Sequence, residues 1–288
     1  MTPTRIDEAG WPAAAAVVTD VRRRHLVAGE DDPLDEAAAL RLKHHGVRDS
    51  ELWLIDNQGF AFAHGGVVAL AVAPDARGRG LGGALAEVTL AGTAPVSAWS
   101  HGDHPAAARL AEKHGLARER ELWVMRRPTH LPLEAAPAPE GVRIRRFADE
   151  DDQDATEIVR VNAAAFAHHR EQGSMDLLEL GERMAEPWFD PAGLIVADDG
   201  HGRVLGFHWT KQHSADLGEV YVVAIDPAAQ GRGLGRVLTL AGLRHLAGLG
   251  VAEVMLYVES DNLPARSLYE RLGFTHDASD THVQYHRG

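Results

Sequence analysis

Hydrophobic and polar positions follow the same order twice along this chain. In each half, two stretches with helical spacing and three strand-like runs precede a glycine-rich motif, and a helix, a strand, a helix and a last strand follow it. The first half predicts helices at 11–26, 31–46 and 105–115 and strands at 51–56, 60–64, 66–73, 96–100 and 121–127. The second half predicts helices at 154–167, 174–186 and 262–273 and strands at 142–147, 193–198, 203–210, 218–225, 252–259 and 281–286. The repeated order indicates an internal duplication of an α/β unit.

A proline-rich stretch separates the two halves. It reads PTHLPLEAAPAPEG, and its four prolines and small residues show neither a helical nor a strand period. We therefore predict an N-terminal domain at 1–127, a linker at 128–141 and a C-terminal domain at 142–288.

Composition narrows the class of protein. A net charge of −13 disfavours nucleic acids and anionic membranes as partners, because both require a basic face. The absence of cysteine excludes disulfides, a cysteine nucleophile and a metal site with thiolate ligands. The first residues lack the pattern of a signal peptide, and no apolar run is long enough to span a membrane. We expect a cytoplasmic protein.

The two glycine motifs are RGRGLGG at 77–83 and QGRGLGR at 230–236. Each predicts a loop from a strand into a helix, where uncovered backbone N–H groups and the positive end of the helix dipole favour a pyrophosphate. The arginines of each motif add positive charge. The alternative is a glycine-rich turn without a ligand.

Two other nucleotide motifs fit less well. Gly78, Gly80 and Gly83 satisfy the dinucleotide pattern G-x-G-x-x-G, and Asp103 lies at a suitable distance. The second copy, however, has Arg236 in place of the third glycine, and each motif follows the third strand of its half rather than the first. A P-loop is excluded because neither motif contains Gly-Lys-Ser/Thr.

The second half resembles the GCN5-related N-acetyltransferase (GNAT) family at two landmarks. QGRGLG at 230–235 matches the family's coenzyme A loop, and SDNLPARSLYERLGF at 260–274 matches its Asn- and Tyr-containing helix. In the first half only RGRGLG at 77–82 and a weaker HPAAARLAEKHGL at 104–116 are similar. The resemblance implies two tandem domains, each a mixed, mainly antiparallel sheet flanked by helices, and acetyl-CoA as cosubstrate.

The resemblance also implies the acetyl-CoA contacts, with the strand before each loop presenting main-chain N–H groups. In the second half they are Val223, Ala224, Ile225, Gln230, Gly231, Arg232, Gly233, Leu234, Gly235, Arg236, Asn262 and Arg266. In the first half they are Leu70, Val72, Arg77, Gly78, Arg79, Gly80, Leu81 and Gly82. Two alternatives stay open for the first half: its loop holds acetyl-CoA without turnover, or it only preserves the fold.

Alignment of the halves on their motifs separates them by chemistry. Glu219 falls opposite Gly66, and Tyr269 falls opposite Ala111. Acetyl transfer to an amine requires a base that yields the neutral amine and benefits from an acid that protonates the leaving thiolate. We predict Glu219 as the base and Tyr269 as the acid, and the second half as the catalytic one.

The tandem build and the stretches GFHWTK, LYVESDN and NAAAFAHHREQG resemble the mycothiol synthase family over essentially the whole chain. That family acetylates the cysteinyl amine of a cysteinyl-glucosaminyl-inositol in the last step of mycothiol synthesis. Carried over by position, the substrate-binding residues are Glu36, Glu171, Lys211, Glu219 and Tyr257, with Glu36 reaching the site from the N-terminal half.

Two other functions are compatible with these motifs: a GNAT enzyme for another amine, such as a peptide N-terminus, a polyamine or an aminoglycoside, and a coenzyme A-binding protein without catalysis. The predicted Glu and Tyr pair speaks against the second. No metal is expected, because His168 and His169 are adjacent rather than four residues apart on a helix. We expect a monomer whose partner is a small cysteinyl glycoconjugate.

Overall fold

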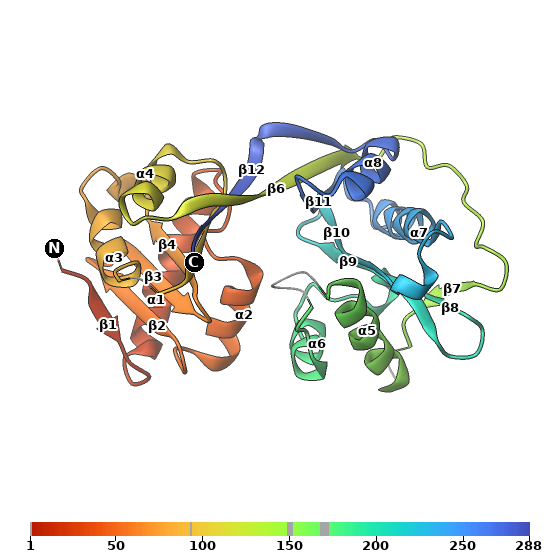
Figure 1. Ribbon diagram of the computed structural model, residues 1–288, viewed down its shortest axis with the longest axis horizontal. Coiled ribbons are helices and arrows are strands. Elements are labelled where there is room, and N and C mark those ends of the chain that lie inside the picture. Colours follow the sequence, from red (N-terminus) through yellow and green to blue (C-terminus); the bar gives the residue numbers. More distant parts are fainter. Residues whose placement is uncertain (1, 93, 149–151, 168–172) are drawn as a thin grey trace. The chain divides into compact units, whose positions relative to one another are not determined.

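The chain divides by its internal contacts into two units, visible in the computed structural model (Figure 1). The structure describes residues 2–92, 94–148, 152–167 and 173–288. Unit 1 holds Met1–Trp123, Glu259–Asp261 and Asp277–Gly288, and unit 2 holds Val124–Val258 and Asn262–His276.

Unit 1 is a sheet with helices on both faces. Its strands follow the order β1-β2-β3-β4-β5-β12, in which only the β4–β5 neighbours run parallel. The strands are β1 (Thr4–Ile6), β2 (Glu51–Ile55), β3 (Gly59–His64), β4 (Val67–Val72), β5 (Val96–Ser100) and β12 (Thr275–Arg287). The helices are α1 (Trp11–Val27), α2 (Glu36–His45), α3 (Leu81–Thr89) and α4 (Pro105–Lys113), with a 3₁₀ turn η1 (Pro74–Ala76) before the glycine loop.

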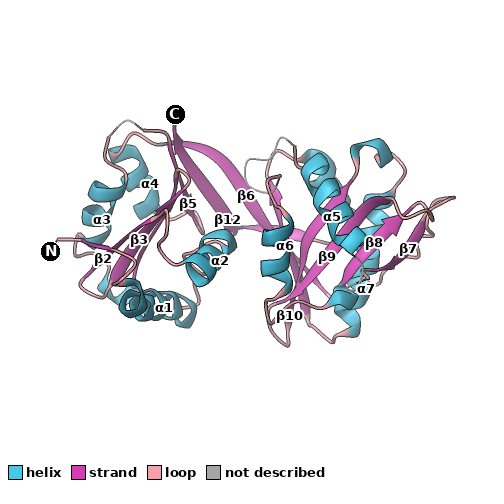
Figure 2. Cartoon of the chain, turned by 90° about the horizontal axis from the view of Figure 1, so that it is seen from below, coloured by secondary structure: helices cyan, strands magenta, loops and turns pink. Residues whose placement is uncertain are grey.

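Alternation along the strands separates the two cores of unit 1. Leu52 and Leu54 of β2 pack with α1 and α2, whereas Ile55 packs with α3 on the opposite face. Figure 2 shows α1 on one side of β2 and β3 and α3 and α4 on the other. The strands β2 and β3 are therefore largely buried between two layers of helices.

Unit 2 repeats this plan, with strands ordered β6-β11-β10-β9-β8-β7. The β10–β11 pair is parallel, and β10–β9, β9–β8 and β8–β7 are antiparallel. The strands are β6 (Ala117–Pro128), of which the part from Val124 belongs to unit 2, β7 (Arg143–Arg146), β8 (Leu194–Asp198), β9 (Val204–Gln212), β10 (Leu217–Ile225) and β11 (Glu253–Glu259). The helices are α5 (Asp152–Ala165), α6 (Leu177–Met184), α7 (Leu234–Gly248) and α8 (Leu263–Arg271), with 3₁₀ turns η2 (Pro191–Gly193) and η3 (Pro227–Ala229).

Two cores lie on opposite faces of the sheet of unit 2. Phe207 and Trp209 of β9 are fully buried against α5 and α6. Leu205 of the same strand packs with Leu234 and Leu238 of α7 on the other face. The predicted fold class, a mixed and mainly antiparallel sheet flanked by helices in each of two tandem parts, is confirmed.

The last strand differs most from its prediction. A strand was expected at 281–286, but β12 runs over Thr275–Arg287, and Val283 to Arg287 pair with Ser100 to Val96 of β5. Because Val283 and Tyr285 pack into the core of α3 and α4, Asp277–Gly288 belongs to unit 1. The units thus divide the chain differently from the predicted domains at 1–127 and 142–288. Residues 129–142, which include most of the predicted linker, form no helix or strand.

Candidate active site

The parallel strands β10 and β11 stay paired over only three residues. Their register ends at Glu219 opposite Met255, whereas β10 continues to pair with β9 as far as Ile225. The N–H of Asp226 donates to the Leu205 carbonyl on the β9 side at 2.9 Å. Since successive N–H groups along a strand point to opposite sides, those of Val223 and Ile225 point toward the gap beside β11.

A β-bulge at Tyr221 marks where β10 leaves its regular pairing, between Val220 and Val222. Bulges bend a strand and increase its twist. In unit 1 the pairing of β4 with β5 also ends early, at Val68 opposite Ala98, but β3 and β4 keep one unbroken register. The gap is therefore present in both units. Among the described residues, a bulge in the strand that precedes the glycine loop occurs in unit 2 and not in unit 1.

The strand ends of unit 1 repeat the main-chain arrangement. The N–H of Ala73 donates to the Gln58 carbonyl on the β3 side at 2.8 Å. By the same alternation, the N–H groups of Leu70 and Val72 point toward the gap beside β5.

The two glycine loops have nearly the same backbone. Gly231 and Gly233 have φ values of 77° and 78°, and Gly78 and Gly80 have values of 78° and 82°. Only glycine adopts this left-handed region without strain. No side chain caps α3 or α7, and a Cβ at any of these glycines would meet open space. The first N–H groups of both helices are therefore available to an anion.

A cavity of about 500 Å³ lies at the unit 2 loop. The predicted cofactor residues that line it are Ile225, Gln230, Gly231, Gly233, Leu234, Gly235 and Arg236. Sequence reasoning missed Ala229 and three residues of α8, namely Pro264, Leu268 and Arg271. The helix pattern itself could have indicated them, since Pro264, Leu268 and Arg271 follow at helical spacing.

Other predicted cofactor residues are placed differently. The side chain of Asn262 caps α8, accepting from the Ala265 N–H at 3.2 Å, so it has a structural role. Val223, Ala224, Arg232, Asn262 and Arg266 are not among the residues that line the cavity.

The arginines of the loops already have protein partners. In unit 2, Arg236 pairs with Glu134 at 2.5 Å, and Arg232 donates to the Glu140 carbonyl at 3.2 Å. In unit 1, Arg77 makes two hydrogen bonds to Glu30, at 2.6 and 2.7 Å. These hydrogen bonds lower the pKa of Glu30 and so favour its ionised form. Arg77 is therefore paired with a carboxylate of the protein.

The guanidinium of the other unit 1 arginine also has a partner. Arg79 donates to the carbonyl of Asp75 at 3.3 Å. Both arginines of the unit 1 motif are therefore engaged by the protein itself.

Glu219 and Lys211 are register partners on β10 and β9, and so lie on the same face of the sheet. Glu219 is buried, at 4% exposure, and its Oε2 lies 2.6 Å from Nε2 of His213. The Lys211 ammonium lies 4.5 Å from the ring centre of Trp188 and 5.2 Å from that of Tyr221. Cation–π contacts of this kind stabilise a partly desolvated ammonium.

Tyr257 lies on the same face. Met255 is the register partner of Glu219, and Tyr257 comes two residues later on β11. Its side chain is exposed, at 41%. The structure therefore brings Glu219, Lys211 and Tyr257 to one face beside the β10–β11 gap.

Tyr269 lies on α8, with its ring centre 5.9 Å from that of Phe274. Desolvation by burial raises the pKa of Tyr269 to about 12. The phenol therefore stays protonated across the working pH range, as a proton donor requires.

The substrate-binding roles of Glu171 and Glu36 stay predictions. Glu171 lies outside the described residues. Glu36 is the first residue of α2 in unit 1, where Asp35 caps the helix by accepting from the Ala38 N–H at 2.7 Å. Its role in the site stays a prediction.

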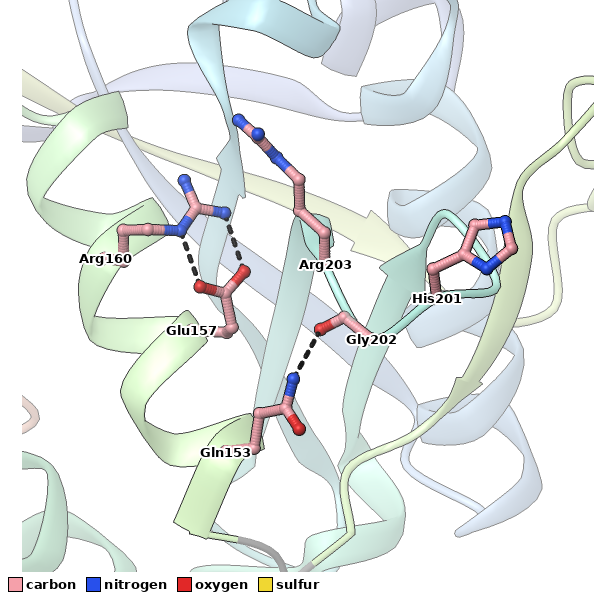
Figure 3. Close-up of a pocket in the computed structure, with 6 residues that line it drawn as sticks. All are labelled: Gln153, Glu157, Arg160, His201, Gly202 and Arg203. Atoms are coloured by element: carbon pink, nitrogen blue, oxygen red, sulfur yellow. Dashed lines mark hydrogen bonds and ion pairs between the residues drawn. The ribbon is translucent and has the colours of Figure 1, made fainter.

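A second cavity, of about 360 Å³, is lined by residues of α5 and of the turn between β8 and β9, and holds an ion-pair network (Figure 3). Figure 3 shows Glu157 and Arg160 of α5 pointing toward each other. The guanidinium of Arg160 donates two hydrogen bonds to the Glu157 carboxylate, of 2.8 and 2.9 Å. Arg160 also donates to Asp226 at 2.8 Å, and Arg203 does so at 3.3 Å. Asp226 stands directly before η3, so this network supports the entry to the glycine loop.

Within the described ranges, no group of three or more His, Cys, Asp or Glu side chains could hold a metal ion. Among the helices of the described residues, none is both long and apolar enough to cross a membrane.

Comparisons with known proteins show the family of this chain. The family model described as "Acetyltransferase (GNAT) family" matches residues 157–274. The chain is 57% identical to a mycothiol acetyltransferase of Nocardioides sp., over 94% of this chain and 97% of the relative. It is 44% identical to a mycothiol acetyltransferase of Salinispora arenicola, over 99% of this chain and 96% of the relative.

Solved structures share the fold. A tandem GNAT protein from the clavulanic acid biosynthesis pathway has a TM-score of 0.69 and 18% identity, covering 99% of this chain and 98% of that one. A GCN5-related N-acetyltransferase from Sphaerobacter thermophilus has a TM-score of 0.65 and 22% identity, covering 99% and 95%.

Proposed function

Since this chain belongs to the mycothiol acetyltransferase family and is an acetyl-CoA-dependent N-acetyltransferase, we propose that it catalyses the last step of mycothiol biosynthesis. In this reaction the acetyl group passes from acetyl-CoA to the cysteinyl amine of 1D-myo-inositol 2-(L-cysteinylamino)-2-deoxyglucopyranoside. The observation that carries the proposal is the buried Glu219 carboxylate beside the β10–β11 gap, on the strand that leads into the glycine loop.

Acetyl-CoA binds along β10 and the loop that follows it. The residues 230–236 and the first turn of α7 hold its pyrophosphate, because their N–H groups carry no side-chain cap. The gap-facing N–H groups of Val223 and Ile225 hold the pantetheine arm and the thioester carbonyl. A main-chain donor at that carbonyl stabilises the oxyanion that forms when the amine attacks.

Glu219 is the base in this proposal. The cysteinyl amine must lose a proton before it attacks, and a buried carboxylate without bulk water around it is a suitable acceptor. The attack is direct, from the amine on the thioester carbonyl, and needs no covalent acyl-enzyme.

Tyr269 is the acid. It protonates the coenzyme A thiolate as the C–S bond breaks. A phenol with a pKa of about 12 is a weak acid toward an ordinary thiolate, whose pKa is about 8.5. The same burial, however, raises the pKa of a thiol formed beside Tyr269. The pKa values of the phenol and the thiol are therefore closer together than their ordinary values suggest.

The glycoconjugate binds on the face shared by Glu219, Lys211 and Tyr257. A pseudodisaccharide with many hydroxyls requires polar side chains held in fixed positions. The aromatic contacts of Lys211 hold its ammonium in place, and the exposed Tyr257 offers a ring and a hydroxyl. We assign Glu171 and Glu36 to the same substrate on the family pattern alone.

Unit 1 lacks the base and the acid, and its loop retains the phosphate-binding backbone. Native mass spectrometry with acetyl-CoA counts the bound coenzymes. Two coenzymes per chain support binding at Leu70, Val72 and residues 77–82. A single coenzyme, lost when Gly233 is replaced, shows that the unit 1 loop only preserves the fold.

The test of the function is a panel of amines incubated with acetyl-CoA, with thiol release and product mass as readouts. Turnover of the cysteinyl glycoconjugate above that of peptide, polyamine and aminoglycoside amines is expected. Turnover of another amine in its place would overturn the substrate assignment, and no turnover of any amine would favour a coenzyme A-binding protein without catalysis.

The test of the mechanism uses two substitutions. Glu219→Gln lowers kcat by about 100-fold or more, most strongly at low pH where the amine is protonated. Tyr269→Phe lowers kcat by about 10-fold or more. The matched controls Glu253→Gln, at a salt bridge to Arg126, and Tyr285→Phe change kcat by less than about twofold. An unchanged pH profile in Glu219→Gln would remove it from the role of base.

A further inference from the structure

His213 contacts the buried base from the hairpin between β9 and β10. It directly follows the last residue of β9, and its Nε2 lies 2.6 Å from Oε2 of Glu219. The side chain of His213 is 33% exposed, whereas that of Glu219 is 6% exposed. The imidazole therefore lies between the buried carboxylate and solvent.

The hairpin holds His213 in this place. The N–H of His213 donates to the Leu217 carbonyl at 2.9 Å, and the Ser214 hydroxyl accepts from the N–H groups of Asp216 and Leu217 at 3.2 and 3.1 Å. These bonds close the turn so that His213 lies beside the start of β10. In unit 1, only Gly65 and Gly66 lie between β3 and β4, so this hairpin has no pair that corresponds to His213 and Glu219.

The contact with His213 decides which carboxylate oxygen of Glu219 is left to accept a proton from the substrate amine. In the ionised form that a base requires, a carboxylate only accepts hydrogen bonds, so the proton of the contact belongs to Nε2 of His213. Oε2 is thereby occupied. Oε1 is the carboxylate oxygen that this contact leaves for the substrate amine.

Other charged groups nearby do not replace this contact. Lys211 is the register partner of Glu219 and has its ammonium over Trp188. Arg183 of α6 donates to the Tyr221 hydroxyl at 3.2 Å. Glu253 of β11 is paired with Arg126 at 3.0 Å.

We propose that His213 is the positioning residue of the base. Its Nε2–H fixes Oε2 of Glu219 and so directs Oε1 to the attacking amine. This inference rests on the proposed role of Glu219. His213 itself touches neither the amine nor the thioester, and its Nδ1 is the ring nitrogen left to exchange hydrogen bonds with water.

Steady-state kinetics with acetyl-CoA and the cysteinyl glycoconjugate test this role in three variants. His213→Leu removes the donor and lowers kcat by about 10- to 100-fold, with the KM for acetyl-CoA unchanged because the glycine loop lies at the other end of β10. His213→Gln keeps an N–H near the position of Nε2 and restores kcat to within about fivefold. The matched control His201→Gln, in the turn between β8 and β9, leaves kcat unchanged.

Two results overturn the proposal. One is a kcat for His213→Leu within twofold of the parent protein, and the other is a Gln variant as impaired as the Leu variant. If the Leu variant does not fold, a ¹H–¹⁵N spectrum of the histidine rings in the parent protein decides, since Nε2 of His213 must carry a proton. A deprotonated Nε2 overturns the proposal.

Glu219→Gln separates this inference from the function itself. Full activity in Glu219→Gln refutes Glu219 as the base and the role of His213 with it. An inactive Glu219→Gln beside fully active His213 variants refutes only the positioning role.

Discussion

Asp226 is expected to support the acetyl-CoA loop, and Asp226→Ala tests this. Its Oδ1 accepts from the Ala228 N–H at 2.9 Å and holds the turn η3, and its Oδ2 accepts from Arg160 at 2.8 Å and Arg203 at 3.3 Å. Asp226 is 4% exposed. The corresponding residue of unit 1 is Ala73, so the substitution gives unit 2 the residue that unit 1 has at this position.

The contacts set the size of the effect. Loss of a capping hydrogen bond costs about 1 kcal/mol. A hydrogen bond between charged groups contributes about 1.5–3 kcal/mol. The loss of the hydrogen bond from Arg160 falls in the lower half of this range, because Arg160 keeps Glu157 and the Val204 carbonyl as partners. Arg203 adds little, since its side chain is 58% exposed. Asp226→Ala should therefore lower the free energy of unfolding of unit 2 by about 2–4 kcal/mol.

Urea unfolding and steady-state kinetics measure the two consequences. A looser η3 should raise the KM for acetyl-CoA by about threefold to tenfold, with a smaller effect on the KM for the amine. The matched control is Asp75→Ala in η1 of unit 1, whose carboxylate is 72% exposed and pairs with Arg24, and which should change neither quantity appreciably.

The pH dependence gives an independent check. The hydrogen bond from Arg160 lowers the pKa of Asp226 below the ordinary value of an aspartate. A depressed native pKa means that the stabilisation is present above the unfolded pKa, about 3.9, and is lost as the pH falls through the native pKa. The difference in stability between the parent protein and Asp226→Ala should shrink below about pH 4. A variant equal to the parent in stability and in the KM for acetyl-CoA at pH 7 would refute the reasoning.

Two further substitutions address other contacts. Gly242→Ala should destabilise unit 2 by about 1–3 kcal/mol in urea unfolding, because its Cβ would lie 2.0 Å from the buried His208 ring. Gly235→Ala is the control, since its Cβ would meet only Leu268 at 3.8 Å, and a Gly242→Ala protein as stable as this control would contradict the packing argument. Arg271→Ala should raise the KM for acetyl-CoA by about threefold to tenfold at unchanged kcat, because Arg271 lines the cavity at the loop; an unchanged KM would exclude it from the cofactor site.

Local signals predicted most elements because each is encoded over a few residues. The glycine loops follow from the left-handed conformations that only glycine adopts easily, and they appear in both units with almost identical φ values. The strands before them follow from apolar runs buried on both faces. The family landmarks in the second half predicted the fold, and the comparison of the two halves predicted Glu219 as the base and Tyr269 as the acid.

Contacts between distant or irregular segments could not be predicted in this way. Nothing in the local pattern of Asp277–Gly288 says that it pairs with β5, because strand pairing depends on register and on available edges. Nothing in the spacing marks Asp226 as the acceptor of Arg160. These depend on side chains from separate elements meeting in space.

The sequence by itself determined the duplication, the two loops and the chemical difference between the halves, since each depends on which residues occur and in what order. The tertiary structure alone decided how those residues are used. The end of β10–β11 pairing at Glu219 points the N–H groups of Val223 and Ile225 into a gap. The hairpin bonds bring His213 within 2.6 Å of a carboxylate that burial has separated from water. A base acts through its surroundings, and only folding assembles those surroundings.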